Sequence, residues 1–118
     1  MDLKSATEKM EKLDIMEIGS DLLGGMFKKT GRAYKRLCPF HEERHASFYI
    51  YPDTQTYVCY GCGRQGKILG LIKMVFNGDG IDILEYLRNR GCDLGRDEGI
   101  LESLILEEEN SGYLPRSI

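Results

Sequence analysis

The sequence lacks the features that would place a chain in a membrane or in an oxidising compartment. No apolar run approaches the roughly 18 residues of a membrane-spanning helix. The first twenty residues mix charged with apolar side chains and contain no signal-peptide core. There is also no internal repeat and no low-complexity tract. At 118 residues we expect a single-domain cytoplasmic protein with no membrane partner.

Residues arranged for catalysis are also missing. The sequence shows no phosphate-binding glycine loop, no nucleophile with an adjacent base and no evident pair of catalytic carboxylates. Asp79 and Asp82 stand at helix-start positions, where capping explains them. We therefore predict no catalytic residue and no small-molecule substrate.

Cysteine is scarce, and three of the four cysteines fall in one short stretch. Cys38 and His41 form a C-x2-H pair, and Cys59 and Cys62 form a C-x2-C pair. Two such pairs, separated by seventeen residues, have the spacing of a closed tetrahedral zinc site. Because the protein supplies all four ligands, no coordination position remains for catalysis. The predicted cofactor is one structural Zn²⁺.

Two alternatives use the same side chains differently. A pair of disulfides requires an oxidising compartment, and a redox C-x-x-C motif gives His41 no role. His45 could in principle replace His41, but C-x6-H does not close the turn, so we expect His45 to be exposed. Cys92 has no partner at ligand spacing and is expected to be a small buried or half-buried thiol.

Charge is distributed unevenly along the chain. The net charge is −3, yet residues 28–75 hold nine basic side chains against three acidic ones, a local balance of +6. The remaining residues therefore sum to −9. Such an asymmetry indicates a polyanion-binding face on an otherwise acidic protein.

Periodicity and turn signals predict an α+β fold: a small zinc ribbon of antiparallel β-hairpins flanked by amphipathic helices. Phe48 and Ile50 should share one face of the second hairpin, with Tyr49 and Tyr51 on the other, available to stack on bases. Asp82 is expected to be the N-cap of the second helix within residues 67–91. In chain order we expect a helix over about Thr7 to Leu23, a hairpin within Met26 to Leu37, a second from Ser47–Tyr51 and Thr56–Val58, helices over 67–91, and a last helix from Asp97 to Glu109.

The motif around the first ligand pair carries a resemblance to a known family. The pattern K-x-x-G-x-x-Y-x-x-L-C-P-F-H over residues 28–41, the following Ser47-Phe48 and the ligand spacing resemble the N-terminal zinc-binding domain of DnaG-type bacterial DNA primases. The resemblance covers about two-thirds of the chain, from Leu13 to Arg90. Its metal positions fall on the same four ligands that the spacing indicates. It implies a zinc-binding domain over residues 1–95, with the ribbon at 26–66, followed by an acidic helix and tail over 96–118.

The resemblance also implies a function and a binding surface. Such a ribbon contacts single-stranded template DNA and helps a separate catalytic domain choose where a primer starts. This chain has Lys67 where the family usually has Asp or Asn, which makes the ribbon more basic. The predicted DNA-binding residues are Lys29, Arg32, Tyr34, Lys35, Arg36, Arg44, Ser47, Phe48 and Lys67.

Three functional hypotheses follow. The favoured one is a primase-type module that binds single-stranded DNA and acts with a catalytic primase subunit or another replication protein. An alternative is a zinc-ribbon adaptor that binds protein through its acidic last helix. In the third, the chain is a fragment or subunit of a complete primase. In each case the polymerising domain is absent from the 118 residues, so we expect no primer synthesis from this chain alone.

Overall fold

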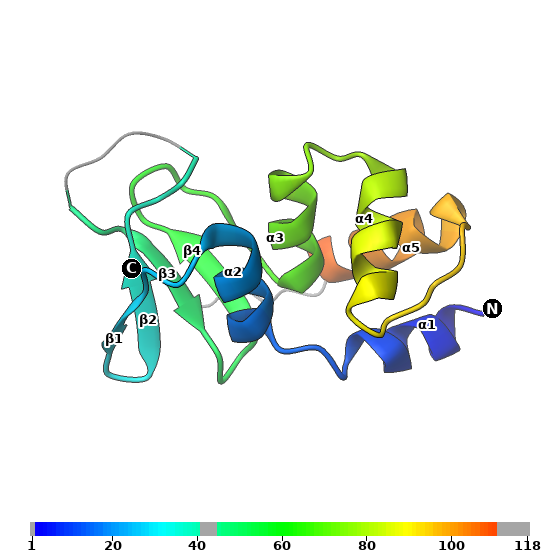
Figure 1. Cartoon of the computed structure of the whole chain (residues 1–118), viewed down its shortest axis with the longest axis horizontal. Helices are drawn as coiled ribbons and strands as arrows, with labels where there is room; N and C mark the ends of the chain where they lie inside the picture. The colour runs from blue at the N-terminus through cyan, green and yellow to red at the C-terminus, as the bar shows by residue number, and fades with distance from the viewer. Residues whose placement is uncertain (1, 41–44, 111–118) are drawn as a thin grey trace.

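The computed structural model describes residues 2–40 and 45–110, which form a small sheet beside a group of helices (Figure 1). Within these ranges, no helix combines the length and apolar character needed to cross a membrane. The elements in chain order are α1 (Leu3–Met10), α2 (Ile15–Leu23), β1 (Lys28–Thr30), β2 (Ala33–Arg36), β3 (Phe48–Tyr51), β4 (Thr56–Cys59), β5 (Gln65–Gly66), α3 (Ile68–Val75), α4 (Gly80–Asn89) and α5 (Glu98–Glu109).

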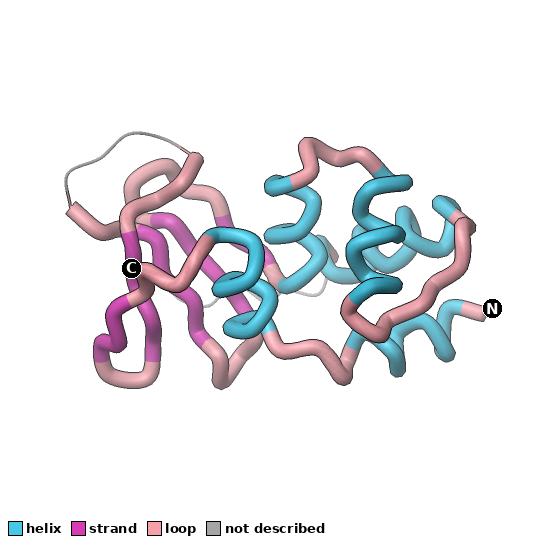
Figure 2. The backbone as a smooth tube through the Cα atoms, viewed as in Figure 1, coloured by secondary structure: helices cyan, strands magenta, loops and turns pink. Residues whose placement is uncertain are grey.

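The five strands form one antiparallel sheet in which each strand pairs with its neighbours in the sequence. The order is β1-β2-β3-β4-β5, so strands that follow one another in the sequence lie side by side and the path needs no crossover (Figure 2). Both predicted hairpins are confirmed, and β5 adds a two-residue edge strand. The predicted α+β class is therefore correct.

The inner face of the sheet packs against helices. Phe48 and Ile50 are fully buried, as the alternation predicted, whereas Tyr49 and Tyr51 on the opposite face are only partly buried. Helix α2 packs on β3 with Gly19 at the contact. This close packing gives the short strands a hydrophobic core that they could not form alone.

The N-terminal region contains two helices where the sequence predicted one from Thr7 to Leu23. The chain leaves α1 after Met10 and begins α2 at Ile15, with Asp14 as the N-cap. Gln55, in the β3–β4 turn, accepts a hydrogen bond from the Ile15 N–H at 2.7 Å and donates one to Asp14 at 3.3 Å. A side chain forty residues away thus satisfies an orphan N–H group and stabilises the break, a contact that helical periodicity does not reveal.

Helix α4 begins slightly earlier than predicted. Asp79, not Asp82, is its N-cap, and the Asp79 carboxylate accepts from the Asp82 N–H at 3.1 Å. Asp82 lies in the first turn, where a negative charge interacts favourably with the helix dipole.

The last helix shares a core with the rest of the chain. Helix α5 packs against α1, α3 and α4, and its Leu101 and Leu104 belong to the same buried cluster as Phe48 and Leu71. Its predicted start is confirmed, because Asp97 caps it by accepting from the Gly99 N–H at 2.9 Å.

Gly19 offers a test of the packing between α2 and the sheet. A Cβ at Gly19 would lie 2.5 Å from the Ile50 Cδ1, so Gly19→Ala should force the buried Ile50 to shift. We expect the free energy of unfolding to fall by about 1–3 kcal/mol, the usual effect of overpacking a core. Urea denaturation followed by circular dichroism measures this change.

The matched control for this test is Gly25→Ala. A Cβ there meets nothing within 4 Å, so its effect should stay within about 0.5 kcal/mol. Equal effects at the two glycines would contradict the packing role of Gly19.

Candidate metal centre

Three cysteines meet where β2, β4 and the β4–β5 turn come together. Cys38 lies two residues beyond β2, Cys59 ends β4, and Cys62 lies in the turn that follows. Their sulfur atoms all lie within 4.8 Å of one another. A tetrahedral zinc ion with Zn–S bonds of about 2.3 Å spaces its sulfur ligands roughly 3.8 Å apart. The cluster therefore has the size of a zinc site.

The turn that carries Cys62 is closed by backbone hydrogen bonds. The Cys59 N–H donates to the Arg64 carbonyl at 2.7 Å, and the Gly63 N–H donates to the Cys59 carbonyl at 2.8 Å. Gly63 has a φ of +81°, a conformation that other residues rarely adopt. These contacts hold Cys59 and Cys62 on the same side of the turn.

The surroundings of the sulfurs differ. Burial raises the pKa of Cys38 to about 12, although the Phe40 N–H donates to its sulfur. At Cys62 burial also acts to raise the pKa. The backbone and guanidinium of Arg64, with help from Cys59 and Cys38, outweigh it and lower that pKa. The guanidinium nitrogen lies 3.2 Å from the Cys62 sulfur.

Hydrogen-bond donors of this kind surround the ligands in metal–thiolate sites. Three thiols held within 4.8 Å of one another suit a cation that can replace their protons. The residues present therefore fit a structural zinc ion, which would supply the central link between β2 and β4.

The other candidate ligands lie outside this cluster or outside the described residues. His41, the predicted fourth ligand, lies outside the described residues, so its assignment stays a prediction. His45 is exposed and is not part of the cluster, as expected. Cys92 is buried elsewhere, with its sulfur 3.6 Å from that of Met10.

The fold and the cysteine cluster define a zinc-ribbon protein, and comparison with known proteins specifies the family. Residues 3–93 match the family model described as CHC2 zinc finger. The chain therefore belongs to the CHC2 zinc finger family.

Curated relatives are much longer than this chain. A DNA primase of Pseudomonas putida is 37% identical over 94 residues, which are 76% of this chain and 14% of that protein. A DNA primase of Thermotoga maritima is 37% identical over 106 residues, 90% of this chain and 17% of that protein. The chain thus spans about one-sixth or less of the length of these relatives.

A solved structure shares the fold. The Aquifex aeolicus primase, in a structure of its zinc binding and RNA polymerase domains, matches with a TM-score of 0.63 and 27% identity. The match covers 76% of this chain and 22% of the other.

Two residues predicted to bind DNA serve the interior and the metal centre. Phe48 has no exposed surface and packs among aromatic rings, stacked on Tyr57 at a centroid distance of 5.7 Å. The Ser47 hydroxyl oxygen lies 3.4 Å from the Cys59 sulfur. Phe48 therefore offers no ring surface for a base to stack on, and Ser47 is placed to support the thiolate.

Three other predicted residues lie toward the inner side of the sheet. Arg36 donates hydrogen bonds to the carbonyls of Leu23 and Leu37, and its guanidinium lies over the Phe27 ring, 5.6 Å from the centroid. Lys29 and Tyr34 are directly opposite each other, and Tyr34 pairs in turn with the buried Ile50.

Lys35, another predicted DNA-binding residue, lies on the other side of the sheet, in a row of side chains whose other members were not among the predicted DNA-binding residues. Residues that pair directly across neighbouring strands share a face of the sheet. We call this side the outer face, and its central row crosses all five strands. The row consists of Lys28, Lys35, Tyr49, Val58 and Gln65.

A cluster of tyrosines lies on the outer face. Tyr49 stacks on Tyr51 with centroids 6.1 Å apart, and Tyr60 meets Tyr49 edge-on at 5.3 Å. The hydroxyls of Tyr51 and Tyr60 are 2.7 Å apart. Alternation in β3 already favoured Tyr49 and Tyr51 as stacking residues, but Tyr60 was missed because it follows the end of its strand.

The remaining predicted residues lie at the edges. Arg32, in the β1–β2 turn, is 91% exposed and pairs with Asp53 at 3.3 Å. Lys67 precedes α3 as its N-cap residue and makes no side-chain cap. Arg44 lies outside the described residues.

Replacing one cysteine of the cluster should remove the metal. In Cys59→Ser the zinc content should fall well below one equivalent, and the β-sheet should unfold, because Cys59 would link β4 to the ion. Metal analysis after dialysis, combined with circular dichroism, tests this. Cys92→Ala is the control and should keep a full equivalent. A full equivalent in Cys59→Ser would show that the cluster does not bind zinc.

Ser47→Ala separates the two roles considered for this side chain. Loss of the hydroxyl beside the Cys59 sulfur should lower zinc affinity about tenfold, as for other outer-shell contacts. DNA affinity of the zinc-loaded protein should be unchanged. Competition with a chromogenic chelator measures the first quantity, with the exposed Ser103→Ala as control. Reduced DNA affinity at unchanged zinc affinity would contradict this assignment.

Proposed function

We propose that this chain is the template-binding zinc module of a DNA primase system and that it holds single-stranded DNA on the outer face. The observation that carries the proposal is the central row of that face. Two lysines stand at one end of the row, and Tyr49 stands beside them.

The chemistry of the outer face suits a single strand. Lysine ammonium groups neutralise phosphates, while exposed aromatic rings stack on bases with little regard to sequence. Each stacked base contributes about 1–3 kcal/mol. Tyr60, at 38% exposure, extends the aromatic surface away from the lysines. A DNA strand that crosses the outer face would thus meet the lysines first and the tyrosine rings next.

The zinc centre and the outer face are built from the same strands. Cys59 ends β4 one residue after Val58 of the central row, and Tyr60 lies between Cys59 and Cys62. We infer that Cys38, Cys59, Cys62 and His41 hold the ion. The ion would keep β2 and β4 in register, so that lysines and tyrosines stay at a fixed separation.

Primer synthesis itself requires groups beyond this module. Its relatives are DNA primases of which it covers 14–17%, and the Aquifex aeolicus structure includes an RNA polymerase domain. We propose that a catalytic primase domain, in the same or a separate polypeptide, joins nucleotides while this module positions the template.

Two adjacent lysines on β1 provide a test of whether the outer face binds single-stranded DNA. Lys28 belongs to the central row, whereas Lys29 pairs with Tyr34 on the inner side; both are exposed. Lys28→Gln should weaken single-strand binding several-fold and lower the slope of log K against log salt by about 0.7, the value for one phosphate. Lys29→Gln, which makes the same change in charge, should alter both quantities much less.

The measurement is fluorescence anisotropy of a labelled oligothymidylate titrated with zinc-loaded protein at several salt concentrations. Equal losses in the two variants would mean that net charge, not the outer face, controls binding. If the unmodified protein fails to bind even at low salt, the proposed function is wrong.

A further inference from the structure

A cleft opens at the edge of the sheet, next to the zinc centre. It has a volume of about 640 Å³ and lies between the cysteine turn, β5, α3 and the end of α5. Phe40 and Met74 give it apolar surface, and Arg64 and Lys73 give it two cations. Gln65 lines the cleft and also ends the central row of the outer face. Gln65, at the β5 edge of the sheet, is therefore shared by the cleft and the proposed DNA-binding face.

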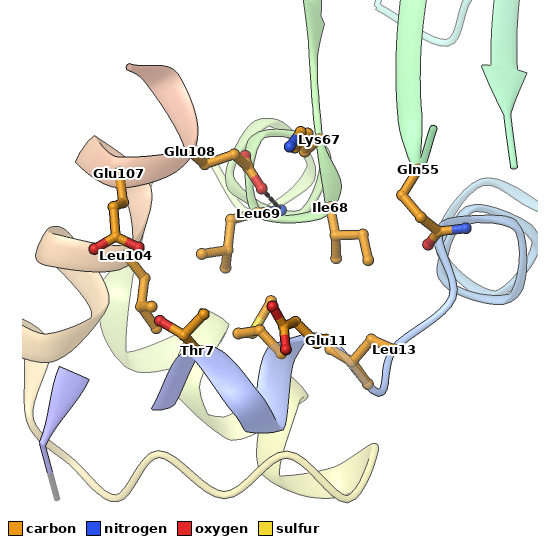
Figure 3. Close-up of a pocket in the computed structure, with 11 residues that line it drawn as sticks. Thr7, Glu11, Leu13, Gln55, Lys67, Ile68, Leu69, Leu104, Glu107 and Glu108 are labelled. Atoms are coloured by element: carbon orange, nitrogen blue, oxygen red, sulfur yellow. Dashed lines mark hydrogen bonds between the residues drawn. The ribbon is translucent and has the colours of Figure 1, made fainter. Parts of the chain in front are cut away.

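The acidic end of α5 closes one side of this cleft. The Glu108 carboxylate accepts hydrogen bonds from the Leu69 N–H at 3.0 Å and the Gly70 N–H at 2.7 Å. Figure 3 shows Glu108 reaching from α5 to the start of α3, beside Lys67. The next residue, Glu109, pairs with Lys73 at 3.8 Å.

The partners of these two carboxylates, backbone N–H groups and a lysine ammonium, are groups that also bind phosphate. Backbone N–H groups at a helix N-terminus and a lysine beside them attract any anion. Burial raises the pKa of Glu108 against the opposing effect of its hydrogen bonds from α3, so desolvation offsets part of what these bonds contribute. The Lys73–Glu109 pair is about half exposed and is weak by itself.

Helix α5 also lies outside the residues that match the family model. That match ends at residue 93, and α5 begins at Glu98. Glycines in α3 and α4 make room for its carboxylates. A Cβ at Gly70 would lie 3.3 Å from a Glu108 carboxylate oxygen, and one at Gly80 would lie 2.5 Å from a Glu98 oxygen.

We propose that the cleft is a second contact site for the single strand and that Glu108 and Glu109 are its intramolecular competitors. The proposal rests on the proposed function. A nucleotide that continues from the outer face past Gln65 places its phosphate near Arg64 and Lys73 and its base against the apolar wall. The bound DNA strand thereby displaces the acidic end of α5.

The first test compares two pairs of substitutions on the same helix. Glu108→Gln/Glu109→Gln removes both competing charges, whereas Glu98→Gln/Glu102→Gln removes two charges nearer the start of α5. By anisotropy with a labelled oligothymidylate, the first pair should bind at least threefold more tightly than the second. Its slope of log K against log salt should be steeper by about 0.7 for each added phosphate contact.

Gly70→Ala provides a second variant that keeps every charge. Its methyl group crowds the Glu108 carboxylate and should loosen the end of α5 without changing the net charge. We expect tighter binding here too. In the unmodified protein, saturation with the oligonucleotide should accelerate hydrogen exchange of the amides at 104–109.

The outcomes separate this inference from the proposed function. Equal affinities for the two glutamate pairs, or unchanged exchange over 104–109, would overturn the competitor role while the Lys28 result still supports the outer face. Absence of binding by every variant would overturn both.

Discussion

The gathering of three cysteine sulfurs within 4.8 Å of one another, a cluster that fits a structural zinc ion, is the constraint on which the rest of the structure depends. The strands are two to four residues long, too short to hold their register by hydrogen bonds alone. Zinc binding contributes roughly 10–16 kcal/mol in small zinc domains, comparable with the entire net stability of a domain of this size. Because Cys38 follows β2 and Cys59 ends β4, the ion would tie together strands on both sides of β3.

The metal centre and the outer face are two consequences of the same strand alternation. In β4, Cys59 points toward the inner side with Phe48, while Val58 points to the opposite side with Tyr49. A shift of one residue in register would exchange these positions and destroy both at once. The proposed DNA-binding surface would therefore depend on the metal even though Cys59 points away from that surface.

Helix α5 packs against α1, α3 and α4. It buries Leu101 and Leu104 in the common core and places its acidic last turn at the start of α3. The six acidic side chains between Asp97 and Glu109 have no basic neighbour within the helix, so the cations they meet come from elsewhere in the fold. Lys73 of α3 is one of these cations.

Local patterns predicted the elements whose causes are local. Aromatic and β-branched residues flanking Pro52 predicted the β3–β4 hairpin, and Asp97 predicted the start of α5. The break between α1 and α2 was not predictable, because Gln55 approaches Asp14 and Ile15 only after the sheet forms. The same limit applies to Phe48 and Arg36, whose residue types suit DNA binding but whose partners lie in the interior or on the backbone.

The sequence by itself determined the fold class, the hairpins and the spacing of the metal ligands, because these depend on residues close together in the chain. Only the tertiary structure decided which basic and aromatic side chains share a face. Strand pairing sends Lys28 and Lys29 to opposite sides of one sheet, and it brings Tyr60 against Tyr49 from another strand's end. The tertiary structure alone also seats Glu108 on α3, because that contact joins residues thirty-eight positions apart.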